Sequence, residues 1–110
     1  MSSRAHEVLW TEIALDDLVA IVTRIALDSP REALDVLSGL RTKAAHLETF
    51  PDRGRVVPEL ADIGVRRYRE LLVSPHRVLY HREESLVYVV AVLDGRRDLE
   101  DTLLRRLLGT

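Results

Sequence analysis

Three runs in the second half of the chain have the hydrophobic pattern of β-strands. They are Arg67–Ser74, Arg77–Arg82 and Leu86–Leu93, separated by short turns at Ser74–Pro75 and Glu83–Ser85. The third run (LVYVVAVL) has almost no polar residue, so we expect it in the middle of a sheet, covered on both faces. The first two runs mix apolar and charged residues, which predicts strands with one buried and one solvent-exposed face.

The first half of the chain combines a short strand with a helical period. His6–Trp10 (HEVLW) is predicted as a strand, and Thr11 can cap a helix that reaches about Leu27. Asp16 and Asp17 are favourable in its early turns, because carboxylates complement the positive end of the helix dipole. The apolar residues of this helix recur at helical spacing and form one stripe: Ala14, Leu18, Ile21, Val22 and Ile25.

A second helix is predicted to follow almost at once. Ser29 can cap it, Pro30 fits its first position, and Glu32 completes a capping box. This helix should reach about Leu47 and end before Pro51. Its apolar stripe consists of Ala33, Val36, Leu37, Leu40, Ala44 and Leu47. Two helices joined by so short a turn should form an antiparallel hairpin that covers one face of the sheet.

The remaining segments are predicted as a loop and a short terminal helix. Phe50–Leu60 contains two prolines and a glycine, which indicates a loop rather than a strand. Asp98 can cap a final helix in which Arg105 and Arg106 lie near the end. The resulting order, β-αα-βββ-α, predicts a single α+β domain over residues 1–110.

Composition narrows the class of protein. A hydrophobic share of 46% can form a core without metal or disulfide support. The chain has no cysteine, which excludes thiol catalysis, cysteine-based zinc sites and disulfides, and fits a reducing cytoplasm. Met1–His6 leads into a mixed run without the apolar core of a signal peptide, and no apolar run approaches 18 residues. We therefore expect a cytoplasmic protein with no membrane association.

The formal charge of −2 conceals an asymmetry along the chain. Residues 1–52 hold 5 Lys/Arg against 9 Asp/Glu, a net −4, whereas residues 53–110 hold 11 against 9, a net +2. Residues 53–82 alone hold 7 against 3, a net +4. This predicts a basic sheet region beside an acidic helical region. The overall balance is far from that of a protein whose affinity depends on many phosphate contacts.

Common catalytic sites have little support. The four histidines, His6, His46, His76 and His81, lack metal-ligand spacing, so no metal is expected. There is no nucleophile elbow and no phosphate-binding glycine loop, and Gly54 between two arginines is predicted as a turn residue. We therefore expect no cofactor.

Basic side chains on the sheet are the remaining candidate site. The residues that could converge at one edge of the sheet are Arg69, Arg77, His81 and Arg96, with Glu59 from the preceding loop. Such a group could bind and polarise a phosphodiester, with arginine stabilising charge and histidine or glutamate moving a proton.

A solvated sheet face is the alternative interpretation, and residue types alone favour it. The arginines would then pair with nearby carboxylates, namely Glu70, Glu83, Asp94 and Asp98. Tyr80 and Tyr88 would be core or rim aromatics rather than base-stacking residues, because aromatics are ordinary in sheets.

An ordered series of short motifs covers nearly the whole chain. It consists of Phe50-Pro51, Gly54-Arg55, Pro58-Glu59-Leu60, Tyr68-Arg69-Glu70-Leu71, His76-Arg77-Val78-Leu79-Tyr80 and Val92-Leu93-Asp94-Gly95-Arg96-Arg97-Asp98. This series resembles the RelE/ParE superfamily of toxins. The resemblance implies a growth-inhibiting toxin of a bacterial type II toxin–antitoxin module, associated in some members with plasmid stabilization. It also implies a fold in which a helical hairpin packs on a small twisted antiparallel sheet joined by the N-terminal strand.

The superfamily divides by target. RelE-like members cut mRNA on the ribosome, and by motif Arg69 and Arg96 match their arginine positions, with His81 or Glu59 available for proton transfer. ParE-like members poison DNA gyrase and have no hydrolytic site. In Gly95-Arg96-Arg97-Asp98-Leu99-Glu100 the histidine and the tyrosine of many nuclease-type members are replaced by Gly95 and Glu100. The resemblance therefore favours a ParE-like gyrase poison. A RelE-like endonuclease and a degenerate, non-toxic antitoxin binder are the alternatives.

The resemblance also implies a cognate antitoxin, in some members within a heterotetramer. An amphipathic antitoxin segment is expected to cover the helical hairpin and extend along the sheet, where its acidic side chains would meet arginines. The residues expected to contact the antitoxin or the target are Arg67, Arg69, Arg77, Tyr80, Arg96 and Arg97.

Overall fold

The computed structural model describes residues 6–94, 102, 105 and 106. In chain order the elements are β1 (Glu7–Trp10), α1 (Glu12–Ala26), α2 (Pro30–Ala45), the short 3₁₀ helix η1 (His46–Glu48), β2 (Arg55–Val56), α3 (Pro58–Ala61), β3 (Tyr68–Val73), β4 (His76–Glu83) and β5 (Leu86–Asp94). Thr102, Arg105 and Arg106 are helical, and the rest of the predicted Asp98-capped helix lies outside the described residues. No helix in the described part of the chain is long and apolar enough to cross a membrane.

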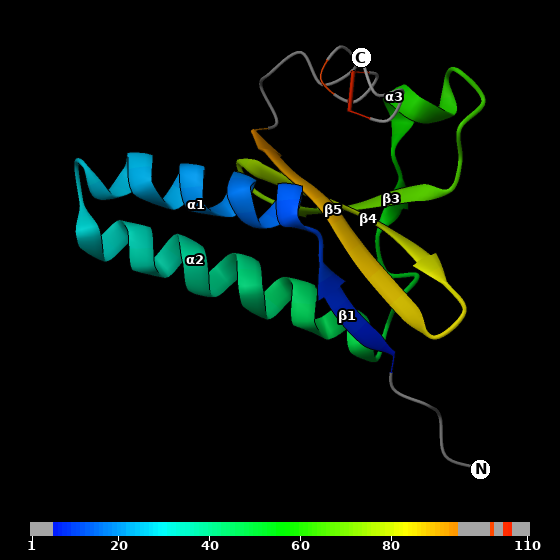
Figure 1. Cartoon of the computed structure of the whole chain (residues 1–110), viewed down its shortest axis with the longest axis horizontal. Coiled ribbons are helices and arrows are strands. Elements are labelled where there is room, and N and C mark those ends of the chain that lie inside the picture. Colours follow the sequence, from blue (N-terminus) through cyan, green and yellow to red (C-terminus); the bar gives the residue numbers. More distant parts are fainter. Residues whose placement is uncertain (1–5, 95–101, 103–104, 107–110) are drawn as a thin grey trace.

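The five strands form one sheet in the order β1-β5-β4-β3-β2. β2, β3, β4 and β5 pair antiparallel with their neighbours, whereas β1 pairs parallel with β5. The three strands predicted in the second half of the chain are confirmed. β5 lies inside the sheet, as its continuous apolar run requires (Figure 1).

Both main helices begin where the sequence predicts. The Thr11 side chain accepts a hydrogen bond from the Ala14 N–H at 3.2 Å, and Ser29 Oγ accepts one from the Glu32 N–H at 3.1 Å. The serine cap of α2 is therefore confirmed, but the predicted capping box is wrong in its second half. The Ser29 N–H donates to the Ile25 carbonyl at the end of α1 instead of to the Glu32 side chain. One short turn thus ends α1 and starts α2.

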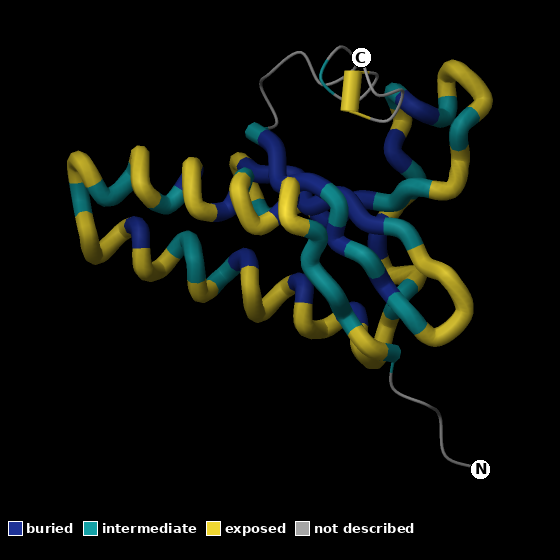
Figure 2. Tube along the Cα trace, in the orientation of Figure 1, coloured by how far each residue is buried: buried dark blue, intermediate teal, exposed yellow. Residues whose placement is uncertain are grey.

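The hairpin of α1 and α2 covers one face of the sheet, as predicted (Figure 1). The burial pattern follows this contact: the buried positions of both helices lie toward each other and the strands, and the outer turns are exposed (Figure 2). The buried core of this face consists of Ala14, Leu18, Ile21, Leu40, Ala44, Leu47, Leu71, Val78, Tyr80, Val87, Val89 and Val92.

A second, smaller core lies on the opposite face of the sheet. It consists of Val57, Leu60, Leu79, Ala91 and Leu93. The prediction of Phe50–Leu60 as a plain loop is therefore wrong, since this segment holds β2 and most of α3. Proline occupies the first turn of α3, where its missing N–H costs no helical hydrogen bond, and the burial of Val57 and Leu60 stabilises the segment on the sheet.

This second core also corrects the prediction for β4. Its residues His76 to Tyr80 are all buried, although the strand was expected to have one solvent-exposed face. Helices cover one side of the strand, and the segment around α3 covers the other. A charged residue of this strand, Arg77, is consequently only 8% exposed.

Gly54 is needed for close packing rather than for a turn. A Cβ at this position would lie 2.5 Å from the Glu70 carbonyl oxygen and 2.7 Å from the Tyr80 hydroxyl. Both are fixed in place by the sheet, because β2 pairs with β3 at Glu70 and Tyr80 is fully buried. The backbone before β2 can approach the sheet only because it has no side chain there.

We therefore expect Gly54→Ala to lower the free energy of unfolding by about 1–3 kcal/mol, as overpacking of a rigid site does. Gly39→Ala is the matched control, because a Cβ there meets nothing within 4 Å and the residue is inside α2. That change should raise stability by about 0.5–1 kcal/mol. Urea denaturation followed by circular dichroism measures both. Equal stability of the two variants would contradict the assignment of Gly54 to close packing.

Candidate functional site

Arg77 lies on the sheet face away from the helical hairpin and is surrounded by carboxylates. Its Nε donates to Glu70 Oε1 at 2.6 Å. Its two Nη groups donate to the two carboxylate oxygens of Glu59, each at 2.8 Å. Glu59 is in α3 and Glu70 is in β3, so one guanidinium joins two elements to β4. Parallel donation of this kind is the strongest geometry available to an arginine–carboxylate pair.

The charged side chains of Glu70 and Arg77 are buried, so each of them needs a partner of opposite charge. The side chain of Glu70 is 0% exposed and that of Arg77 is 10% exposed. Arg55 in β2 donates from Nε to the second oxygen of Glu70 at 2.7 Å. We refer to Arg55, Glu59, Glu70 and Arg77 as the Arg77 cluster. A charge buried to this degree requires a partner, and here each carboxylate has one.

The ionisation of the cluster follows from these contacts. The hydrogen bonds from Arg77 lower the pKa of Glu59 below its usual value, against the opposing effect of burial. Glu59 in turn raises the pKa of Arg77, with further support from Glu70. Glu59 is therefore a stabilised carboxylate, which disfavours the role in proton transfer that the sequence allowed.

Arg69 lies on the opposite face of the sheet. The turn between β3 and β4 pairs Val73 with His76, so Arg69 is paired with Tyr80 and Arg77 with Leu72. Since successive strand residues alternate between faces, this register separates the two arginines. The predicted convergence of Arg69 and Arg77 is therefore wrong.

Arg69 instead fixes the segment before β2. Its Nη1 donates to the Gly54 carbonyl at 2.7 Å, and the Gly54 N–H donates to the Tyr80 hydroxyl at 2.8 Å. Tyr80 is 0% exposed, which confirms its interpretation as a core aromatic, and burial raises the pKa of its hydroxyl. The predicted site residues Arg69 and Tyr80 thus hold a backbone segment.

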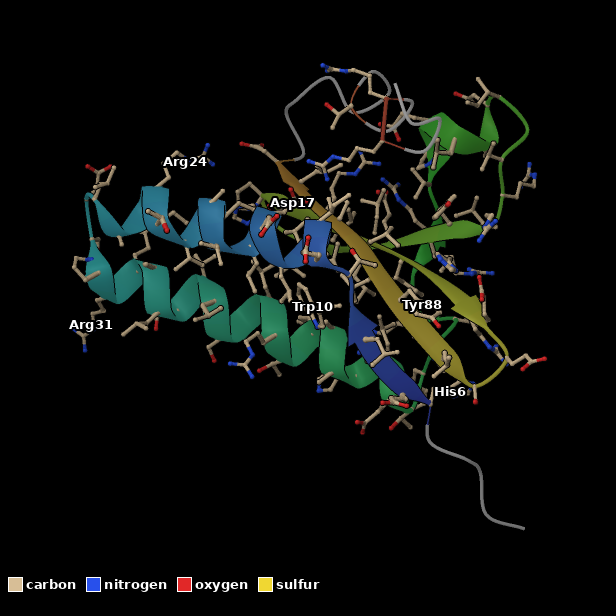
Figure 3. The ribbon with its side chains drawn as sticks, viewed as in Figure 1. His6, Trp10, Asp17, Arg24, Arg31 and Tyr88 are labelled. Atoms are coloured by element: carbon tan, nitrogen blue, oxygen red, sulfur yellow. The ribbon has the colours of Figure 1, made fainter. Side chains whose placement is uncertain are left out.

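His81 shares a face with Arg77 but lies four residues further along β4. At about 3.3 Å per residue, the two positions are roughly 13 Å apart. The His81 ring lies between Tyr68 and Tyr88, with ring centroids 5.5 and 5.3 Å away. Burial, and secondarily the charge of Arg67, lowers the pKa of His81, so its imidazole is neutral at pH 7. Tyr88 is seen on β5 in Figure 3.

Arg67, just before β3, and Arg82 on β4 also have acidic neighbours. Arg67 lies 3.5 Å from Glu83 and over the ring of Tyr68, and Arg82 Nη1 donates to Asp52 at 2.9 Å. The interpretation that sheet arginines pair with carboxylates is confirmed for Arg77 with Glu70 and for Arg67 with Glu83. Arg96, Arg97 and Asp98 lie outside the described residues.

Asp17 has a role that no local pattern in the sequence indicates. Its Oδ2 accepts the backbone N–H of Val92 at 3.0 Å, and its carboxylate accepts two hydrogen bonds from Arg106 at 2.8 and 3.0 Å. One carboxylate of α1, labelled Asp17 in Figure 3, therefore binds both β5 and a residue near the C-terminus. The partners are 75 and 89 residues away in the chain, so sequence spacing carries no signal for them.

The Arg77 cluster predicts a large loss of stability for Arg77→Ala. This change leaves the buried carboxylate of Glu70 with Arg55 alone, so the free energy of unfolding should fall by about 3 kcal/mol. Arg67→Ala is the matched control, because that arginine and its partner are largely exposed and the change should be about 0.5 kcal/mol or less. Chemical denaturation at pH 7 compares the two. Comparable losses would show that the cluster is not a principal stabilising contact.

The histidines and Glu59 together predict a loss of stability on acidification. Burial lowers the pKa values of His76 and His81 in the folded protein, so the unfolded chain binds more protons below about pH 6.5. The lowered pKa of Glu59 adds a second decrease below about pH 4.5. Thermal melts between pH 7.5 and 4 should show a falling Tm. His81→Phe should reduce the loss between pH 7.5 and 5.5, and an unchanged pH profile would contradict this account.

The chain is similar to known toxins along most of its length. Residues 8–99 match the model of the family described as ParE toxin of type II toxin–antitoxin system, parDE. Toxin RelE2 of Caulobacter vibrioides is 35% identical over 92 residues, which cover 83% of this chain and 97% of that protein. A solved structure described as the chromosomal ParDE TA system from P. aeruginosa shares the fold, with a TM-score of 0.67 at 21% identity over 84% of this chain and 98% of that chain. This chain therefore belongs to the ParE toxin family of type II toxin–antitoxin systems.

Proposed function

We propose that this toxin inhibits growth by binding DNA gyrase and that it does not cleave RNA. The main observation behind the proposal is that the N–H donors of Arg77 are already bonded to carboxylates of the toxin itself. Its guanidinium donates three hydrogen bonds to two carboxylates and is 10% exposed, so it cannot also bind a phosphodiester. An arginine that stabilises a transition state must face the position where negative charge develops.

Two other candidate nuclease residues, Arg69 and His81, support the same conclusion. Cleavage of RNA without a metal requires a proton-transfer group and a cation at the same phosphate. Arg69 lies on the helical side of the sheet and binds the Gly54 carbonyl, whereas His81 lies on the other side between two tyrosines. These groups cannot act on one phosphate, which favours a toxin that acts by contact with a protein.

As a member of this family, the toxin has a cognate antitoxin as its partner. We propose that an amphipathic antitoxin segment covers the outer surface of the helical hairpin, which is largely exposed (Figure 2) and carries apolar side chains. The large exposed apolar residues of the two helices and their turn are Ile13, Leu15, Val19, Leu27 and Leu34. Leu34 also lines a surface groove of about 440 Å³ on α2, together with Leu37 and Arg41 among others.

Acidic antitoxin side chains were expected to meet Arg67, Arg69 or Arg77. Arg77 and Arg69 are already bonded within the toxin, which leaves Arg67, 60% exposed in its side chain, as the best placed of the three. We propose that contact with the antitoxin extends along the sheet at Arg67. The cytoplasm, where gyrase and the antitoxin are found, is the proposed location.

The gyrase proposal predicts that purified toxin inhibits supercoiling of relaxed plasmid by DNA gyrase. Inhibition or trapped cleaved DNA is expected at a few-fold molar excess, and pre-mixing with the cognate antitoxin should abolish it. Absence of any effect at a large excess, with a toxin sample that is folded by circular dichroism, would contradict the proposal.

The same proposal predicts intact transcripts in cells that express the toxin. Primer extension on translated mRNA measures this directly. Codon-positioned cuts that disappear with Arg69→Ala would instead establish the RelE-like alternative. Normal growth without antitoxin, with the protein present at ordinary levels, would identify a non-toxic antitoxin binder.

A further inference from the structure

Positively charged side chains without an ion pair lie close together at the β2 edge of the sheet. Three arginines of the sheet, Arg55, Arg77 and Arg82, are paired with carboxylates, as is Arg67 just before β3. Lys43 in the last turn of α2 and Arg53 before β2 are both exposed and have no ion pair within the described part of the chain. These two cations come from segments that the fold brings to one pocket.

The pocket has a volume of about 250 Å³ and is lined by Lys43, Arg53, Gly54, Arg55, Glu70, Leu71 and Leu72. We call it the cationic pocket. Arg55 donates its Nε to Glu70 but is still 55% exposed in its side chain, so it adds an accessible arginine to the wall, although its charge is balanced within the Arg77 cluster. The volume corresponds to about eight water molecules, which is room for one phosphate group and part of its hydration shell.

The single carboxylate in the wall does not cancel this charge. Glu70 is fully buried and receives hydrogen bonds from Arg55 and Arg77 on its two oxygens. Its negative charge is therefore already matched within the Arg77 cluster. What the cationic pocket presents to a ligand is the charge of Lys43 and Arg53, with the outer part of Arg55.

We propose that the cationic pocket binds a backbone phosphate of the DNA on which gyrase acts. Two unpaired cations and an exposed, paired arginine around one small pocket match a tetrahedral group with several acceptor oxygens better than a planar carboxylate, which one guanidinium can satisfy. This inference rests on the proposed function, because it supplies a DNA contact for a toxin bound to the gyrase–DNA complex. With a protein of net charge −2, such a contact is local and weak by itself.

The test measures binding of purified toxin to a fluorescent 20-base-pair duplex by anisotropy, from 50 to 200 mM salt, without gyrase. The variant is the double change Lys43→Ala with Arg53→Ala, which removes two exposed charges and no ion pair of the described residues. If the one phosphate contact is lost, wild-type affinity should fall about three- to fourfold more than that of the variant over this salt range. At 50 mM salt the variant should bind at least tenfold more weakly.

The matched control is Arg24→Ala with Arg31→Ala, which removes the same charge at the far end of the helical hairpin (Figure 3). It should bind the duplex as the wild type does, apart from a small effect of net charge. Equal binding by the Lys43/Arg53 variant and the wild type would overturn the proposal. So would tighter binding of a poly-glutamate peptide than of the duplex, since that would identify an acidic protein segment as the ligand.

A parallel experiment with gyrase distinguishes failure of this inference from failure of the proposed function. In the supercoiling assay the Lys43/Arg53 variant should need several-fold more toxin for half inhibition than the control variant. If wild-type toxin fails to inhibit gyrase while the duplex result holds, the proposed target is wrong and the phosphate site stands. If wild-type toxin inhibits gyrase and the two variants are equal in both assays, the phosphate site is wrong and the target stands.

Discussion

The buried pairing of Arg77 with Glu70 and Glu59 is the contact on which the sheet's outer face depends. It joins β4 to β3 and α3, and through Arg55 it reaches β2. Two of these elements are short: α3 contains only Pro58–Ala61 and β2 only Arg55–Val56. Segments of this length have no stability of their own, so their position is set by the ion pairs and by the small core beneath them.

The same contact decides what the face can do chemically. An arginine on a sheet can bind a phosphate only if its N–H donors are free. The donors of Arg77 are bonded to Glu70 and Glu59 in the folded protein. The unpaired positive charges lie instead at the edge of the sheet, where Lys43 and Arg53 form no ion pair with the other described residues. The arginines on the face of the sheet are paired, whereas the cations at its edge are not. This difference is the physical reason for proposing that the toxin binds a macromolecule rather than catalyses a reaction.

Local signals in the sequence predicted most of the fold. Caps at Thr11 and Ser29, a 3.6-residue period and continuous apolar strands each depend on neighbours a few residues away. The site was less predictable because it depends on register: the pairing of Val73 with His76 decides that Arg69 and Arg77 face opposite ways. The pairing of Glu59 with Arg77, and the packing around Gly54, join segments whose distance in space no spacing rule encodes.

Asp17 has a consequence for the solubility of the fold. The pairing of β1 with β5 ends at Trp10 and Val89, so the second half of β5 continues beyond its neighbour. An unpaired strand edge is a template for association with other chains. By accepting the Val92 N–H and holding Arg106 beside it, Asp17 occupies this edge with a charged group. A helix residue thus protects the sheet from edge-to-edge aggregation, a task that a further strand performs in larger sheets.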